Sequence, residues 1–107
     1  MLQKEDILFE IETPIDVLVR TTHEYWRIIT IRKHPVMADK LELVKGCLGD
    51  PDEIRQSKSD PSVYPFYKKI RSNRWISAVT KRLNGTGFLV TAYITDAVKE
   101  GNRLWNK

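Results

Sequence analysis

The alternation of apolar and polar positions predicts strands in two parts of the chain. Near the N-terminus, residues 7–12 have the composition of a short strand that Pro14 interrupts, and residues 15–19 alternate in the same way. Three longer runs rich in β-branched and aromatic side chains follow in the second half, at residues 62–71, 74–83 and 87–95. Turn residues separate these runs at Ser72-Asn73 and at Asn84-Gly85, so the runs predict an antiparallel meander.

Between these two parts the spacing becomes helical. Thr21 and Glu24 fit a capping box in which Thr21 is the N-cap. Apolar positions then recur every three to four residues, which predicts a helix over residues 22–33. The β-branched run from Ile28 to Ile31 leaves a strand as the alternative.

A second helix is expected after His34-Pro35, because the residue before a proline avoids the helical region and proline suits the first position of a new helix. One buried stripe follows at three- to four-residue spacing: Met37, Leu41, Val44 and Leu48. Gly49 and Pro51 end this helix. The single cysteine, Cys47, lies on its apolar side, as a core residue does.

These elements predict an α+β fold in one domain spanning residues 1–107, since this length supports one hydrophobic core. N-terminal helices are expected to pack on one face of a roughly four-stranded antiparallel sheet. Residues 52–60 are expected to form a partly extended connection, and residues 97–105 a short C-terminal helix or tail docked through Trp105. In the last strand, the side chains expected to face the helices are Phe88, Val90, Ala92 and Ile94, and those on the open face are Leu89, Thr91, Tyr93 and Thr95.

Charge is distributed unevenly along the chain, although the net charge is only +4. Residues 1–52 have a balance of −3, whereas residues 53–82 have eight Lys and Arg against two acidic residues. The cations of this basic block are Arg55, Lys58, Lys68, Lys69, Arg71, Arg74, Lys81 and Arg82. Interleaved with them are the aromatic residues Tyr64, Phe66, Tyr67 and Trp75. Cations beside stacking rings suit a polyanion with flat bases, and the alternative is a solvated sheet face whose lysine stems cover the rings.

The sequence contains no phosphate-binding loop, dinucleotide fingerprint, metalloprotease motif or nucleophile elbow. Its one cysteine and its histidines at positions 23 and 34 lack the close paired spacing of a zinc site, and the strands carry no dense acidic cluster for magnesium. We therefore expect no metal and no cofactor. Hydrolysis without a metal suits RNA, whose 2′-hydroxyl is an internal nucleophile, if the protein supplies a proton acceptor, a proton donor and cations.

A candidate site is expected on the open face of the meander. The hydroxyl groups and lysines that can hold a phosphate there are Thr91, Tyr93, Thr95, Lys81 and Lys68. The alternative is an ordinary solvated face, because Thr and Tyr are common in strands for packing reasons. His34 is the titratable candidate, since an imidazole changes its charge near neutral pH. Its alternative role is that of a capping or hydrogen-bonded residue before proline, and His23 is expected to be exposed.

A series of short motifs runs through most of the chain. In order they are Tyr25-Trp26, His34-Pro35-Val36-Met37, Asp50-Pro51-Asp52-Glu53-Ile54-Arg55-Gln56-Ser57, Val63-Tyr64-Pro65-Phe66-Tyr67, Arg74-Trp75-Ile76, Gly87-Phe88-Leu89-Val90-Thr91-Ala92-Tyr93-Ile94-Thr95-Asp96, and Lys99-Glu100-Gly101 followed by Trp105. Over about residues 17–105 this series resembles a family of small bacterial proteins of the phage-type barnase–EndoU–colicin–RelE nuclease superfamily. The resemblance implies a nuclease-like core in those residues and metal-independent RNA cleavage by a toxin-like or phage-associated protein.

Carried over onto this sequence, the resemblance points to His34, Arg55, Tyr64, Lys81, Thr91 and Tyr93. The Thr91-x-Tyr93 pair on the last strand is the best match to the superfamily pattern. The pattern has a proline after this tyrosine, where Ile94 stands in this chain. That difference removes a kink expected at the end of the strand.

We therefore expect an RNA-binding protein that is a metal-independent endoribonuclease. The residues expected to act in catalysis are His34, Lys81, Thr91 and Tyr93. The residues expected to bind phosphate or RNA are Arg55, Lys58, Tyr64, Lys68 and Arg74. The alternative is a non-catalytic interaction or RNA-binding module with the same fold, whose partner is an antitoxin or another protein. The lack of a membrane-spanning apolar run and of a signal-peptide layout predicts a cytoplasmic protein without membrane contact.

Overall fold

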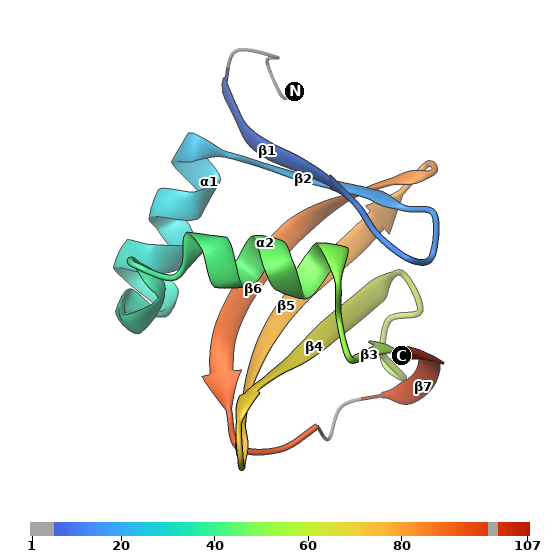
Figure 1. The fold of residues 1–107 in the computed structure, drawn as a ribbon. Helices are drawn as coiled ribbons and strands as arrows, with labels where there is room; N and C mark the ends of the chain where they lie inside the picture. The colour runs from blue at the N-terminus through green and yellow to red at the C-terminus, as the bar shows by residue number, and fades with distance from the viewer. Residues whose placement is uncertain (1–5, 99–100) are drawn as a thin grey trace.

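The computed structural model describes residues 6–98 and 101–107. Within them, seven strands form one sheet in the order β1-β2-β6-β5-β4-β3-β7, and the helices pack on one of its faces (Figure 1). The strands are β1 (Ile7–Glu12), β2 (Leu18–Thr22), β3 (Glu53–Gln56), β4 (Val63–Arg71), β5 (Arg74–Leu83), β6 (Thr86–Thr95) and β7 (Asn102–Asn106). The α+β class is confirmed, but the sheet is larger than the four strands expected. It is also mixed, because β2 pairs with β6 in parallel.

An N-terminal hairpin precedes the helices, which confirms the strand expected over residues 7–12, moves the second one to Leu18–Thr22, and corrects the description of the helices as N-terminal. β1 and β2 pair antiparallel, and residues 18–20 of β2 then pair with residues 86–88 of β6. Among the described residues no strand continues this pairing along residues 89–95. The second half of β6 therefore has an edge that is open to contacts from the helical segments, and the helical turn at Ile29–Lys33 lies beside it (Figure 1).

The first helix, α1 (His23–Ile28), begins at Thr22, whose hydroxyl accepts a hydrogen bond from the Tyr25 amide at 3.0 Å. The N-cap is therefore one residue later than expected, because the Thr22 hydroxyl supplies the acceptor. A π-helical turn, η2 (Ile29–Lys33), continues the helix. The helix expected over residues 22–33 is confirmed, and its strand alternative is wrong.

The second helical segment is divided in two. A short 3-10 turn, η3 (Pro35–Met37), begins at the expected proline, and α2 (Leu41–Gly49) follows after a break. The expected apolar stripe is confirmed, since Met37, Val44 and Leu48 are buried and Leu41 packs against them. None of the helices in the described part of the chain is long and apolar enough to span a membrane.

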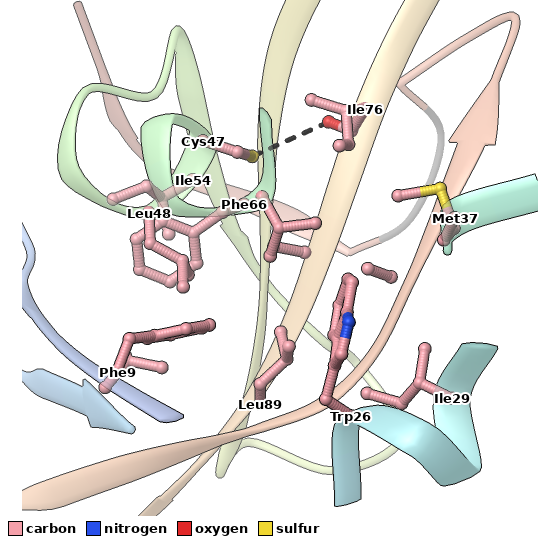
Figure 2. Close-up of a cluster of buried hydrophobic side chains, with 14 of the residues drawn as sticks. Phe9, Trp26, Ile29, Met37, Cys47, Leu48, Ile54, Phe66, Ile76 and Leu89 are labelled. Atoms are coloured by element: carbon pink, nitrogen blue, oxygen red, sulfur yellow. Dashed lines mark hydrogen bonds between the residues drawn. The ribbon is translucent and has the colours of Figure 1, made fainter. Parts of the chain in front are cut away.

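The core lies between α2 and the sheet (Figure 2). Phe9 from β1, Trp26 from α1 and Leu89 from β6 enclose one end of it. Cys47 is buried as expected, and its thiol donates a hydrogen bond to the Ile76 carbonyl at 3.6 Å. Burial raises the pKa of this thiol to about 12.

The C-terminal segment forms a strand, which corrects the expectation of a short helix or tail. β7 pairs with β3, and Ile54 lies opposite Trp105. β3 itself occupies part of the expected connection at residues 52–60. Trp105 packs against the core, so its expected docking is confirmed. Because three strands, β5, β4 and β3, lie between β6 and β7 in the strand order, β7 is added at the far edge of the sheet from β6.

A β-bulge in β6 changes which of its side chains face the core. Val90 is an extra residue with no partner in β5. Leu89 and Ala92 on either side of it are both buried in the core. The expected alternation is therefore correct beyond the bulge, where Ala92 faces the helices, and wrong before it, where Leu89 rather than Phe88 is buried.

Candidate catalytic site at the edge of strand β6

Two backbone irregularities meet at the open edge of β6. One is the bulge at Val90, and the other is the π-helical turn η2, in which the His34 amide donates to the Ile29 carbonyl at 2.7 Å. Both kinds of irregularity occur often next to functional sites. Lys33 joins them, since its ammonium donates a hydrogen bond to the Val90 carbonyl at 3.2 Å. The side chains around this junction form the β6-edge site: Tyr25, Lys33, His34, Thr91 and Tyr93.

Lys33 is the cation of the β6-edge site. Its ammonium lies 3.5 Å from the Tyr25 hydroxyl and 5.5 Å from the centre of the Tyr25 ring. The Tyr25 ring in turn meets Phe88 edge-on, with the ring centres 6.3 Å apart. These contacts hold Lys33 along β6, while the residue remains exposed to solvent.

His34 and Tyr93 come together at the same site. Their ring centres lie 5.6 Å apart and their planes are tilted by 38°. Both residues are half-buried. His34 occupies the N-cap position of η3 with a backbone outside the helical region (φ −142°, ψ 79°), and its side chain makes no capping hydrogen bond to η3. The backbone of His34 therefore caps both turns, as the alternative expected, since its amide donates to the Ile29 carbonyl and its carbonyl accepts from the Met37 amide, while its imidazole faces Tyr93.

Thr91 lies two residues before Tyr93 on β6. Its hydroxyl oxygen is buried and has no hydrogen-bond partner among the described residues. A buried polar atom without a partner is rare in proteins and costs about 1–3 kcal/mol. The Thr91 hydroxyl can therefore gain a hydrogen bond from a ligand only if the side chains that cover it move aside.

Toward the middle of the sheet, the face that carries Tyr93 is not accessible to solvent. A cross-strand row leads from Tyr93 to Ser77 on β5, to Tyr67 on β4 and to Glu53 on β3. Ser77 is 0% exposed and Tyr67 is 1% exposed. The broad open face expected from the sequence is therefore reduced here to the edge of β6, because the middle strands carry buried side chains.

Lys81 lies on β5 outside the β6-edge site. It is four residues from Ser77, about 13 Å along the strand at the usual rise per residue. Its ammonium lies 3.5 Å from a carboxylate oxygen of Asp60. Hydrogen bonds from Ser62, together with the charge of Lys81, hold the pKa of Asp60 below its usual value. Lys81 is too far away to hold the same phosphate group as His34 and Tyr93.

Arg55 takes part in an ion pair on β3, three strands away from β6 in the sheet. Its Nε lies 2.6 Å from a carboxylate oxygen of Glu53, and its Nη1 donates to the Gly101 carbonyl at 3.0 Å. Arg103 Nε lies 3.4 Å from the same oxygen of Glu53. The side chains of Arg55 and Glu53 are 19% and 14% exposed. Arg55 therefore ties β3 to β7, away from the β6-edge site.

The remaining expected RNA-binding residues lie on other surfaces. Tyr64 packs against the core on the helix side of the sheet. Lys68 donates to the Asp50 carbonyl at 2.7 Å at the end of α2. Lys58 is exposed in the loop after β3, and Arg74 is exposed at the start of β5. Of the nine expected site residues, the structure thus brings together three: His34, Thr91 and Tyr93.

Sequence reasoning missed Lys33 and Tyr25. Lys33 lies outside the basic block, and the helical spacing alone assigned Tyr25 to packing. The one available signal was the cation directly before His34 at the end of a predicted helix. Within residues 6–98 and 101–107, no three Asp, Glu, His or Cys side chains lie close enough together to hold a metal ion.

The chain matches no protein-family model, and no similar protein was found among curated proteins or among solved structures. The β6-edge site is therefore interpreted from its own geometry and from the sequence.

Proposed function

We propose that the protein binds RNA and cleaves it at the β6-edge site without a metal ion or cofactor. The observation that supports this most strongly is the Lys33–Val90 hydrogen bond, which joins a π-helical turn to a β-bulge. The same junction gathers an ammonium group, an imidazole and a phenol at one edge of the sheet. Departures from regular structure that serve no evident packing need are typical of functional sites.

The proposed reaction uses the 2′-hydroxyl of RNA as the nucleophile. His34 takes the proton of that hydroxyl while the 2′-oxygen bonds to phosphorus. The bond from phosphorus to the 5′-oxygen breaks, and Tyr93 gives its proton to that oxygen. The products are a 2′,3′-cyclic phosphate and a free 5′-hydroxyl. Proton transfer from the imidazolium to the phenolate across the ring contact then restores both groups.

Charge that develops on the phosphate during this reaction needs nearby hydrogen-bond donors and cations. Lys33 supplies the cation, because its ammonium is held at the carbonyl that directly precedes Thr91. The Thr91 hydroxyl, which is buried without a partner among the described residues, supplies a donor once the side chains that cover it move aside. Lys81 has a different role in this proposal, which is to bind a neighbouring phosphate of the same strand.

The proposal agrees with the resemblance to the barnase–EndoU–colicin–RelE superfamily over about residues 17–105. A cytoplasmic setting also suits it, because RNA is the substrate and the one cysteine is a buried free thiol.

A second candidate function is RNA binding without cleavage. The observation that favours it is the engagement of two expected phosphate-binding residues elsewhere, since Arg55 is paired with Glu53 and Lys81 with Asp60. In that case His34 and Tyr93 would contact the RNA without transferring protons. The two candidates differ in one measurable respect, because only the enzyme forms cyclic phosphate ends.

The test is incubation of the purified protein with total RNA and with a matched DNA, both in excess EDTA. We expect RNA fragments with 2′,3′-cyclic phosphate ends and intact DNA. Tyr93→Phe and His34→Ala should each lower the cleavage rate by about 10²–10⁴-fold, the usual contribution of a general acid or base.

Two matched controls accompany these variants. Tyr64→Phe removes a phenol hydroxyl on the opposite face of the sheet, and His23→Ala removes an exposed imidazole at the start of α1. Both should keep the full rate. Equal cutting of DNA, loss of cleavage in EDTA, or equal effects of the control variants would contradict the proposed mechanism. RNA binding with no cleavage by any variant would favour the second candidate.

A further inference from the structure

The ends of β4, β5 and β6 extend past α2 and leave part of the helix-side face of the sheet uncovered (Figure 1). A groove of about 510 Å³ lies there, between the first half of α2 and the hairpin that joins β4 to β5. Its aliphatic lining comes from η3, α2, β4 and β6: Val36, Leu43, Ile70 and Ile94. We name it the hairpin groove.

Aliphatic side chains in the hairpin groove are unusually exposed. Val36 is 61% exposed, and Leu43 and Ile70 are each 40% exposed. These three residues come from separate elements and gather around one hollow, so they are not isolated surface residues. Clustered apolar side chains of this kind mark sites of interaction with another molecule.

Two arginines border the same groove. Arg71 and Arg74 lie directly opposite each other across the hairpin turn. Among the described residues neither has an ion-pair partner or a side-chain hydrogen bond. Like charges opposite each other on neighbouring strands destabilise a hairpin. A carboxylate bound between these guanidinium groups would remove the repulsion and match their fork-shaped donors.

We propose that the hairpin groove binds an acidic, amphipathic segment of a partner protein. The aliphatic lining fits Leu, Ile or Val side chains of such a segment, and Arg71 and Arg74 fit its Asp or Glu residues. RNA fits less well, because none of the described residues that line the groove has an aromatic ring on which a base could stack. A second copy of the chain fits less well too, since a twofold contact would bring the same arginines together.

The hairpin groove is separate from the β6-edge site. Ile94 lines the groove, and the neighbouring Tyr93 side chain points to the other side of β6. The inference therefore does not depend on ribonuclease activity.

The test is selection from a displayed library of random dodecapeptides on the folded protein and on two double variants. We expect the wild-type chain to enrich peptides that combine aliphatic with acidic residues, and Leu43→Ser/Ile70→Ser to lose that enrichment. Arg71→Glu/Arg74→Glu should enrich basic residues in place of acidic ones. Thermal unfolding followed by circular dichroism establishes that each variant is folded. A variant that does not fold is replaced by the corresponding single substitution.

A change from acidic to basic peptides on the Arg71→Glu/Arg74→Glu variant would support the proposal. A surface that binds peptides without specificity would select the same peptides before and after this substitution. No enrichment on the wild-type chain, or the same peptides on all three proteins, would overturn it. A dimer in sedimentation that the Leu43→Ser/Ile70→Ser variant abolishes would also overturn it, in favour of a second copy. Loss of RNA binding in the Arg71→Glu/Arg74→Glu variant, without any selection of peptides, would likewise overturn the proposal and indicate that the groove binds RNA.

Discussion

The rings of His34 and Tyr93 lie in contact because β6 contains one extra residue. Their centres are 5.6 Å apart. Without the bulge at Val90, the alternation that buries Leu89 would also turn Thr91 and Tyr93 toward the core. The bulge therefore places these two hydroxyl-bearing side chains on the side of the strand where His34 ends the π-helical turn.

Replacing Lys33 by methionine tests the role of the ammonium group in the β6-edge site. The substitution keeps the side-chain stem but removes the charge and the hydrogen bond to the Val90 carbonyl. We expect kcat/KM on RNA to fall by about tenfold or more, since such a factor corresponds to one charge-assisted hydrogen bond. The thermal midpoint should change little, because the residue is exposed.

Lys45→Met is the matched control for this variant. Lys45 lies on α2 and pairs with Glu42 at the surface, so its replacement removes the same charge away from the site. It should leave kcat/KM unchanged. Similar losses of kcat/KM in both variants would show that the net charge of the protein, and not the position of Lys33, determines the activity.

Binding of single-stranded RNA should weaken steeply with salt, because each phosphate contacted releases a counterion. Lys81→Met should lower the slope of log affinity against log salt concentration by about 0.7, the value for one contact to a single strand. Fluorescence anisotropy at several salt concentrations measures this slope. An unchanged slope would remove Lys81 from the RNA-binding surface.

Gly101 is required where the chain enters β7. Its φ is +74°, and a Cβ atom there would overlap the carbonyl of Gln56. Gly101→Ala should therefore displace β7 from β3 and destabilise the fold by about 2 kcal/mol or more. For a chain of this size that lowers the thermal midpoint by roughly 8 °C or more.

Gly46→Ala should have the opposite effect. Gly46 lies inside α2, and a Cβ atom there would meet nothing within 4 Å. Alanine in a helix interior is more favourable than glycine by about 0.5–1 kcal/mol. Calorimetry should show a lower midpoint for Gly101→Ala and a higher one for Gly46→Ala, and a midpoint change of the same sign in both would contradict this account of the two glycines.

Cys47 should resist alkylation in the folded protein. Burial raises the pKa of its thiol to about 12, so almost no thiolate is present at pH 8. Iodoacetamide should leave the native chain unmodified over hours and label it rapidly in denaturant, as followed by mass spectrometry. Rapid labelling of the native chain would mean that α2 separates readily from the sheet.

Local patterns were sufficient to predict much of this fold. Turn residues delimit the three meander strands, and the apolar stripe of α2 identifies its buried face. β3 and β7 were not predicted, because each is short and is defined by a partner far away in sequence, as Ile54 and Trp105 show. The parallel pairing of β2 with β6 likewise has no local signal.

The candidate site could be predicted only in part, for the same reason. Residue chemistry identified His34, Thr91 and Tyr93, but the basic block directed attention to Arg55 and Lys81, which form ion pairs elsewhere. The number of cations in a stretch of sequence does not show which of them form ion pairs with carboxylates in the folded protein. The bulge that turns Tyr93 toward His34 depends on how β5 and β6 pair, and that pairing has no sequence motif.

The most direct test of the account is cleavage of an RNA oligonucleotide with a single 2′-deoxynucleotide at the cleaved position. This one change should block cleavage of that bond in EDTA and leave binding nearly unchanged, because only the nucleophile is removed. The unmodified oligonucleotide should give a 2′,3′-cyclic phosphate and a 5′-hydroxyl. Cleavage at the 2′-deoxy position, or fragments with 5′-phosphate ends, would contradict the central claim that the β6-edge site activates the hydroxyl of its own substrate.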